Sequence, residues 1–209
     1  MFQNIHSKVT VMTKSFYQAL EERRSHRVVN NEIQVSEERL QEIVEFAVKH
    51  IPSAFDLPSA RLVMLTGESH NRLWDITTNT LKQILGDRDF EPTQSRMDAF
   101  KAGYGTVLFF EDETTVTSLQ EKFPSYAENF PNWSQQSSGM HQLVVWSALS
   151  AEGLGASLQH YNPLIDDQVK TEWDIPASWK LIAQMPFGNP TAELAEKTFQ
   201  PIEERVKFY

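Results

Sequence analysis

Residues 134–161 constrain the fold more than any other stretch of this chain. Small and apolar residues recur there at helical spacing, and the flank is apolar too, which predicts a buried helix. Its inward face is expected to carry Met140, Leu143, Val144, Ser147, Ala148 and Ala151, and its flank Val145, Trp146 and Leu149. Gly153 is typical of a residue that ends a helix in the left-handed conformation, and residues 154–159 then predict a short buried strand. Because Gln159, His160 and Tyr161 are polar, we expect a flat ligand to bind where the chain leaves this strand.

The length and charge of the chain limit the number of domains and the kinds of partner that we expect. Its 209 residues contain no linker rich in Gly, Ser or Pro, so we expect a single domain over residues 1–209. The 19 basic residues are outnumbered by 28 acidic ones, and no basic run is longer than Arg23–Arg24. This balance argues against nucleic acid and anionic membranes as partners. No apolar run reaches the roughly 18 residues of a membrane span and no signal-peptide core is present, so we expect a soluble, cytoplasmic protein.

Several chemistries lose their support in the sequence. The chain has no cysteine, which excludes disulfides, thiolate metal sites and cysteine nucleophiles. Its six histidines lack the spacing of metal ligands, so we expect no metal. The glycine pairs 103/105 and 153/155 stand in the wrong order relative to the expected strands and helices for a dinucleotide-binding or phosphate-binding loop. No Gly-x-Ser-x-Gly nucleophile motif is present.

Helix and strand signals alternate along the rest of the chain. A helix over residues 13–23 is expected to bury Phe16, Ala19 and Leu20. Ser36 is typical of a helix N-cap, and Pro52 is expected to stop the helix that it begins. The apolar stripe of this second helix comprises Leu40, Ile43, Val44, Ala47 and Val48. The other expected elements are strands over 61–66, 106–110 and 179–185, helices over 68–85, 95–102 and 166–173, and a solvated loop over 86–92.

Three arginines follow the first helix. Arg23, Arg24 and Arg27 surround Ser25 and His26. One interpretation is that these cations complement the negative end of the helix dipole. The other is an anion site, because guanidinium groups, a hydroxyl and free backbone N–H groups together suit a phosphate.

Aromatic residues gather in the segment from Phe123 to Trp133, which also holds Tyr126 and Phe130. Pro124 and Pro131 interrupt this segment. Aromatic residues at such density form either a satellite core or the wall of a pocket for a flat ligand. The spacing leaves both interpretations open.

The last twenty residues, 190–209, carry few core signals of their own. Their apolar residues Phe199, Ile202, Val206 and Phe208 nevertheless need a surface to pack on. A second subunit is one candidate for that surface.

Longer strings resemble a known family. Resemblance to the nitroreductase family is carried by Glu-Arg-Arg-Ser-His-Arg near the N-terminus, by Pro-Ser-Ala-Phe-Asp after the second helix, and by Gln-Gln-Ser-Ser-Gly-Met-His-Gln with the later Gly-Leu-Gly-Ala. The chain more closely resembles one subgroup of this family, the fatty acid repression mutant subgroup. Three strings carry this closer resemblance: Lys-Ala-Gly-Tyr-Gly-Thr-Val-Leu-Phe-Phe-Glu-Asp, Phe-Pro-Ser-Tyr-Ala-Glu-Asn-Phe-Pro-Asn-Trp-Ser-Gln-Gln and Leu-Gln-His-Tyr-Asn-Pro. The resemblance runs from about Ser15 to the C-terminus.

This resemblance implies an α+β fold with a mixed sheet wrapped by helices. It also implies an FMN-dependent homodimer with two flavin sites at the subunit interface, and a domain-swapped C-terminal segment, about residues 190–209, that reaches onto the partner. NADH or NADPH would reduce the flavin, and a nitroaromatic, a quinone or a similar acceptor would reoxidise it. Both would use the same flavin face in turn, so no separate dinucleotide fold is needed.

The resemblance also assigns residues to the FMN site. Arg23 and Arg27 match cationic contacts near the phosphate and the pyrimidine edge of the flavin, and Arg24 and Ser25 lie in the same loop. A positive charge near the pyrimidine edge stabilises the anionic reduced flavin. The other residues expected to contact the cofactor are Pro52, Ser53, Asp56, Gln159, His160, Tyr161, Lys197 and Arg205.

Some positions depart from the family pattern. Asp56 stands where Asn is usual and Pro58 where Gln is common, and an ionised Asp56 close to the flavin would lower its reduction potential. Phe199 replaces a common Arg, for which Arg205 is a candidate substitute.

The part played by His160 has two interpretations. Either its backbone N–H alone faces the flavin N5 atom, or its side chain also donates a proton.

Two classes of function stay open on the sequence. The first is an enzyme that passes a hydride from a nicotinamide to an acceptor held by Tyr126, Phe130 and Trp133. The second is a non-catalytic flavin-binding sensor or regulator in a lipid or oxidative-stress response. A flavin-free globular protein is a third, simpler alternative.

Overall fold

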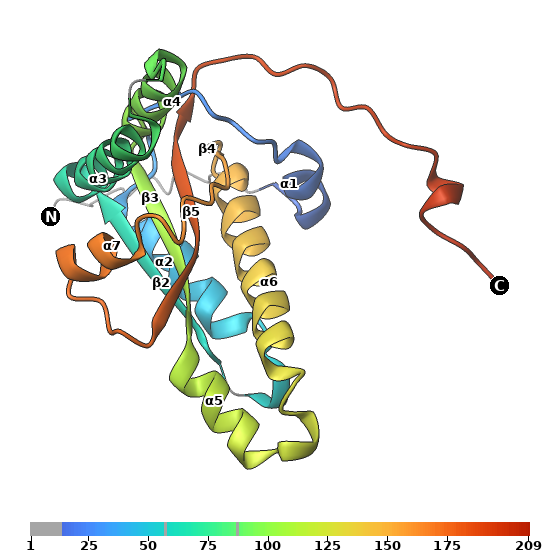
Figure 1. Ribbon diagram of the computed structural model, residues 1–209. Coiled ribbons are helices and arrows are strands. Elements are labelled where there is room, and N and C mark those ends of the chain that lie inside the picture. The colour runs from blue at the N-terminus through green and yellow to red at the C-terminus, as the bar shows by residue number, and fades with distance from the viewer. Residues whose placement is uncertain (1–13, 57, 87) are drawn as a thin grey trace, which may run out of the picture.

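The computed structural model describes residues 14–56, 58–86 and 88–209, and an antiparallel sheet lies at its centre (Figure 1). Its strands lie in the order β1–β5–β3–β2, and β4 pairs with β5. The strands are β1 (Val29–Asn30), β2 (Ala60–Thr66), β3 (Gly105–Asp112), β4 (Gly155–Ala156) and β5 (Trp179–Pro190). All pairings between these strands are antiparallel. We expected a sheet that mixes parallel and antiparallel strands. In the described chain the only parallel pairing is one isolated bridge, between Ser25 and Ala156.

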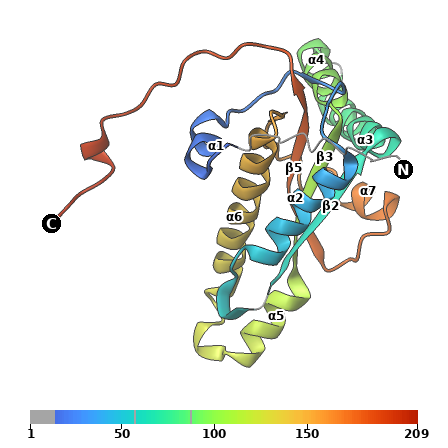
Figure 2. The same cartoon turned by 180° about the vertical axis from the view of Figure 1, so that it is seen from behind.

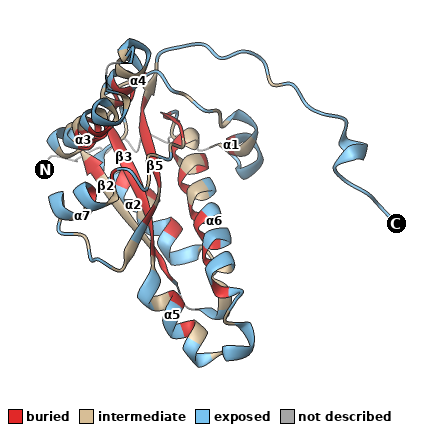
Figure 3. Ribbon diagram, viewed as in Figure 1, coloured by how far each residue is buried: buried red, intermediate tan, exposed pale blue. Residues whose placement is uncertain are grey.

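Helices cover both faces of the sheet, and the predicted α+β class is confirmed (Figure 2). The helices are α1 (Phe16–Glu22), α2 (Glu37–His50), α3 (Gly67–Leu85), α4 (Glu91–Lys101), α5 (Glu113–Lys122), α6 (Phe130–Ala151) and α7 (Asp166–Glu172). Short 3-10 turns lie at Ala54–Asp56, Pro124–Tyr126 and Ile202–Glu204. Alternate residues of β3 serve the two cores, because Val107 and Phe109 pack with α2 and α6 while Leu108 and Phe110 pack with α3, α4 and α7. Burial is therefore concentrated along β3, β5 and the inner helix faces (Figure 3).

Most of the predicted elements are present, with some ends shifted. The Ser36 side chain accepts a hydrogen bond from the Arg39 backbone N–H and caps α2, as predicted. α4 begins at Glu91 instead of 95, so the predicted loop is shorter, because a proline such as Pro92 is accepted in the first turn of a helix. β5 continues to Pro190 because its second half pairs with both β1 and β4.

The inward face predicted for α6 is partly wrong. Met140 and Leu143 are 40% and 46% exposed in the single chain. The buried stripe is instead more polar and comprises Phe130, Ser134, Ser137, Ser138, His141, Val145, Ser147 and Leu149. Two of its polar members bond to backbone carbonyls: the Ser137 hydroxyl donates to the Pro52 carbonyl (3.1 Å), and His141 Nδ1 lies 2.8 Å from the Ser137 carbonyl. Hydrophobic periodicity therefore failed at Met140 and Leu143, whereas Ser147 is buried and Val144 and Ala148 pack against the core as predicted.

Apolar side chains remain exposed on several outer elements. Phe16, predicted to face inward, is 68% exposed on α1, and Val48 of α2 is 42% exposed. Residues 191–209 leave the body of the molecule as an extended arm (Figure 1). On this arm Phe199 is 83% and Phe208 93% exposed. Within the described ranges every helix is too short or too polar to span a bilayer.

Replacing Ser36 with alanine is expected to lower the free energy of unfolding by about 1 kcal/mol, because the N-terminus of α2 loses its capping acceptor. Chemical denaturation monitored by circular dichroism would measure this change. The control is Ser95→Ala on the exposed surface of α4, where alanine favours the helix. Equal stability of the Ser36→Ala protein and the unmodified protein would contradict the capping role.

Candidate functional site

The segment Arg23–Arg27 lies against β4 at the C-terminal end of α6. α1 ends at Glu22, and the His26 backbone N–H donates to the Ala156 carbonyl (2.9 Å) beside the Ser25–Ala156 bridge. Gly155 permits this contact, because a Cβ atom there would lie 2.8 Å from the His26 Cβ. The glycine is therefore part of what holds the arginine segment in place.

Arg23 is held flat on a ring of α6. Its guanidinium carbon lies 4.3 Å from the centre of the Trp146 ring, and the Trp146 indole N–H donates to the Ala156 carbonyl (3.2 Å). Burial and then the positive charge of Arg24 lower the pKa of Arg23 and of His26. Among the residues that the structure describes, Arg23, Arg24 and Arg27 form no ion pair with a carboxylate. The segment is thus a concentration of positive charge without an internal counter-ion.

The structure brings one of the two predicted C-terminal cations to this segment. The Lys197 ammonium donates to the Glu21 carbonyl at the end of α1. Arg205 lies farther along the exposed arm, where its backbone N–H donates to the Ile202 carbonyl. Among the described residues no hydrogen bond links Arg205 to the arginine segment, so its role stays a prediction.

The exit of the β4 segment presents one free backbone donor. Gln159 exchanges both backbone hydrogen bonds with Gln184 (2.7 and 2.9 Å), and the Tyr161 N–H donates to the Gln184 side-chain oxygen (2.7 Å). Between them, the His160 N–H has no bonded acceptor in the described part of the chain. The Tyr161 ring packs edge-on against Trp74 (5.9 Å) and belongs to the core. Among the three predicted residues, the His160 amide is thus the group available to a ligand.

The arginine segment and the His160 amide lie close together. Ser25 is bridged to Ala156, and His160 is four positions beyond Ala156 in the sequence. At about 3.3 Å per extended residue, that separation is at most roughly 13 Å. Lys197 approaches from the side of α1. Cations and a free amide are therefore placed where one elongated anionic ligand could touch both.

The remaining predicted cofactor residues, Pro52, Ser53 and Asp56, lie in the loop after α2, which contacts α6 at another place. Their loop is fixed by the bond from the Ser137 hydroxyl to the Pro52 carbonyl. Ser137 and Trp146 are nine positions apart on this helix, which corresponds to about 14 Å along its axis. A single chain therefore presents two groups of predicted residues at different places on α6.

A pocket of about 340 Å³ opens beside this loop. We call it the aromatic pocket, and its lining residues are Pro52, Ser53, Ala54, Phe55, Trp133, Gln136, Ser137 and Met140. Phe55 and Asp56 both adopt left-handed backbone conformations, with φ of 57° and 54°. Such conformations are costly for residues other than glycine and cluster at functional sites.

Phe55 is the centre of the aromatic cluster, and the sequence did not indicate this residue. Its ring centre lies 4.6 Å from that of Phe123, 5.7 Å from Tyr126 and 6.1 Å from Trp133. Phe130 is 1% exposed and packs with α5, so it is satellite core. Trp133 lines the open pocket, so a role of this segment in binding a flat ligand stays a prediction. The left-handed turn that presents Phe55 has no glycine to signal it.

Comparisons with known proteins identify the family of this chain. Residues 20–189 match the family described as the nitroreductase family. The Saccharomyces cerevisiae protein HBN1 is 39% identical over 160 residues, covering 77% of this chain and 79% of HBN1. The nitroreductase FRM2 of the same yeast is 36% identical over 156 residues, covering 75% of this chain and 77% of FRM2.

Solved structures show the same relationship. Nitroreductase CinD from Lactococcus lactis, in complex with nicotinic acid, has a TM-score of 0.87 and 45% identity and covers 93% of this chain and 100% of that one. Other CinD structures hold chloramphenicol or 4-nitrophenol. A protein of the same fold from Exiguobacterium sibiricum, solved with FMN, has a TM-score of 0.69 at 12% identity and covers 94% of this chain and 98% of that one. The resemblance seen in the sequence is confirmed, and the chain belongs to the nitroreductase family of oxidoreductases.

Proposed function

We propose that this protein binds FMN and uses NADH or NADPH to reduce nitroaromatic compounds, quinones or similar electrophilic acceptors. The observation that supports this most is the junction at Ala156, where the Ser25 bridge sets three arginines without counter-ions near the free His160 amide. A phosphate needs cations, and a flavin ring needs a donor at its N5 atom. The junction offers both within the length of a few residues.

The residues present fit the cofactor. Arg23, Arg24, Ser25, Arg27 and Lys197 would hold the phosphate and the pyrimidine edge, because guanidinium groups form paired hydrogen bonds with such oxygens. The His160 amide would orient the ring. Bound FMN supplies the hydride acceptor and donor of the reaction. Positive charge at the pyrimidine edge would raise its reduction potential by stabilising the anionic reduced form.

We also propose a homodimer. The two groups of predicted residues contact α6 at Ser137 and at Trp146, positions about 14 Å apart along the helix axis, and the exposed Met140 and Leu143 belong to the same helix. A second copy laid over α6 would cover these side chains and could bring its own loop 52–56 to the arginine segment. The exposed arm 191–209, with Phe199 and Phe208, would then have a partner surface to pack on.

The acceptor would occupy the aromatic pocket. Trp133 and Phe55 line it, and Tyr126 lies beside Phe55 and is 48% exposed. Aromatic rings favour flat ligands by stacking. The nitrophenol and chloramphenicol found in CinD are aromatic nitro compounds of the kind expected here.

The test is an anaerobic titration of the FMN-loaded protein with NADH and with NADPH, followed by oxidation with a quinone. We expect bleaching of the flavin absorbance, its recovery on adding quinone, and steady turnover. Flavin binding without turnover would favour the sensor, and failure to bind added FMN would reject the proposal. Sedimentation equilibrium tests the dimer separately.

The side chain of His160 is expected to matter little. Because the backbone amide is the free donor, His160→Ala should keep turnover within about 2-fold of the unmodified protein. Steady-state kinetics with a quinone would measure this. A loss of 10-fold or more, restored at lower pH, would show instead that the imidazole donates a proton.

A further inference from the structure

Glu111 is a buried carboxylic acid at the end of β3. It is 2% exposed, and its Oε2 atom accepts a hydrogen bond from the Ser59 hydroxyl. Its Oε1 atom has no hydrogen-bond partner among the described residues. An ionised carboxylate whose one hydrogen-bond donor in the described part of the chain is the Ser59 hydroxyl is costly in such a place. The geometry therefore favours the protonated form, in which the Ser59 hydroxyl can turn to accept the proton of the acid.

No neighbouring cation among the residues that the structure describes is placed to pair with Glu111 in its ionised form. Lys180 stands opposite Glu111 in the β3–β5 register, but it is exposed. Arg61 of β2 is paired with Asp112 (3.0 Å), and Glu113 begins α5 beside the same surface. Burial raises the pKa of Glu111 to about 7, against the opposing effects of the Ser59 bond and Arg61.

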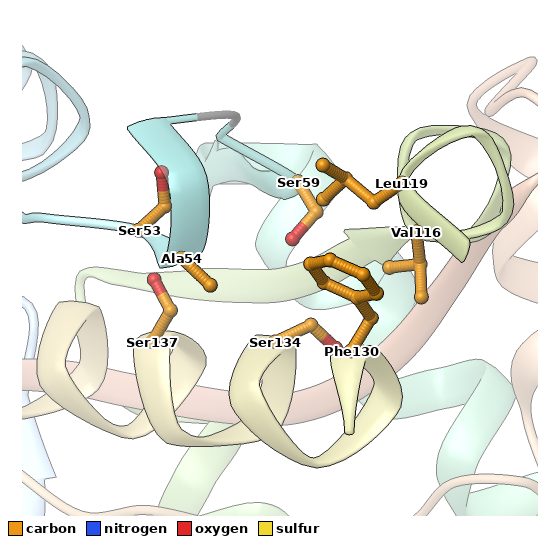
Figure 4. A pocket seen from close by; sticks show the side chains of 8 residues that line it. All are labelled: Ser53, Ala54, Ser59, Val116, Leu119, Phe130, Ser134 and Ser137. Atoms are coloured by element: carbon orange, nitrogen blue, oxygen red, sulfur yellow. The ribbon is translucent and has the colours of Figure 1, made fainter. Parts of the chain in front are cut away.

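Ser59 connects Glu111 to a small internal cavity, which we call the serine cavity (Figure 4). Its lining residues are Ser53, Ala54, Ser59, Val116, Leu119, Phe130, Ser134 and Ser137. The cavity measures about 10 Å³, which is room for roughly one water molecule between these hydroxyls. Ser53, Ala54 and Ser137 line both this cavity and the aromatic pocket. A water molecule in the serine cavity would therefore connect the Ser59 hydroxyl with the wall of the aromatic pocket.

A second pocket lies on the other side of Glu111 and opens to the surface. A surface pocket of about 360 Å³ is lined by Glu111 and by Gln120, Gln135 and Lys180. Ser134 lines both this pocket and the serine cavity. Glu111 therefore stands between an outer pocket, from which a proton can enter, and an inner path toward the aromatic pocket.

We propose that Glu111 is a proton-holding residue, which supplies a proton through Ser59 and the serine cavity to an acceptor in the aromatic pocket. The inference rests on the proposed function. Reduction of a quinone to a hydroquinone consumes one hydride, from the reduced flavin, and one proton. Glu111 gives up its O–H proton through Ser59 and becomes a carboxylate. Solvent at the outer pocket then restores the proton, so that charge and atoms balance.

The experiment separates proton supply from other steps by using two oxidants. A benzoquinone needs protons and ferricyanide does not. Stopped-flow reoxidation of the reduced, FMN-loaded protein is compared for the unmodified chain, Glu111→Gln, Ser59→Ala and the exposed α5 control Glu121→Gln. We expect Glu111→Gln and Ser59→Ala to slow reoxidation by benzoquinone at least 10-fold and to leave ferricyanide unaffected. We also expect Ser59→Thr, which keeps the hydroxyl, to restore the rate.

Two further measurements, the pH dependence of the quinone rate and an infrared titration, also test the role of Glu111. The quinone rate of the unmodified protein should fall as pH rises through about 7, and this dependence should be absent in Glu111→Gln. The infrared band of a protonated carboxylic acid should titrate over the same range in flavin-free protein and be missing in that variant. Equal losses with both oxidants would overturn the inference in favour of a structural role. An unchanged quinone rate, or no such band, would also overturn it, whereas failure of flavin reduction by nicotinamides rejects only the proposed function.

Discussion

Replacing Arg23 and Arg27 together with alanine is expected to weaken FMN binding by about 10²- to 10⁴-fold. Each hydrogen bond to a charged group contributes roughly 1.5–3 kcal/mol, and every 1.4 kcal/mol is a factor of ten. Neither arginine is paired with a carboxylate in the described chain, so their charge is available to the cofactor. Titration of flavin-free protein with FMN, followed by flavin fluorescence, measures the dissociation constant.

The control for this double variant is Arg88→Ala. Arg88 is exposed and donates only to backbone carbonyls at the end of α3, so its loss should leave FMN affinity unchanged. Because Arg23 also packs on Trp146, circular dichroism must show that the double variant is folded. An affinity within 3-fold of the unmodified protein, in a folded variant, would exclude the arginine segment as the phosphate site.

Replacing Glu111 with glutamine is expected to stabilise the protein by roughly 3 kcal/mol at pH 8 and to have little effect near pH 4. Burial raises the pKa of Glu111 from 4.5 to about 7, so between these values the folded state holds a proton that the unfolded state releases. The contribution of Glu111 to the free energy of unfolding is therefore greatest below about pH 4.5 and is lost as the pH rises to 7. Urea denaturation across this range would measure the difference between the two proteins.

His70 changes the stability of the protein with pH in the opposite direction, over nearly the same pH range. It is 0% exposed, and burial lowers its pKa from 6.5 to about 4, so its contribution is lost as pH falls below 6.5. The unmodified protein should consequently show a shallow dependence on pH, and Glu111→Gln should become more stable as pH rises. The control Glu121→Gln should follow the unmodified protein. Parallel curves for Glu111→Gln and the unmodified protein would mean that Glu111 is ionised in the folded state.

The sequence predicted helices and strands well where residues close together in the chain determine them. The cap at Ser36, the left-handed Gly153 and the apolar run of β3 each depend on residues close in sequence. β1 was missed because its two residues are held by β5, some 160 positions away. Local pattern could not reveal that pairing.

The site was predictable only in part. Resemblance to the family supplied the arginine segment and residues 159–161, and the structure brings these together through the Ser25–Ala156 bridge. Resemblance did not show that Gln184, from β5, occupies the amides of Gln159 and Tyr161 and leaves that of His160 free. Phe55 and Glu111 were likewise missed, because the first depends on backbone conformation and the second on burial between elements.

The central claim is that the arginine segment and the His160 amide bind opposite parts of one FMN molecule. A crystal structure of the protein with FMN tests it most directly. The phosphate is expected within hydrogen-bond distance of the arginine segment, and the flavin N5 atom should face the His160 N–H. Flavin located away from the Ser25–Ala156 junction, or a phosphate without arginine contacts, would contradict the account.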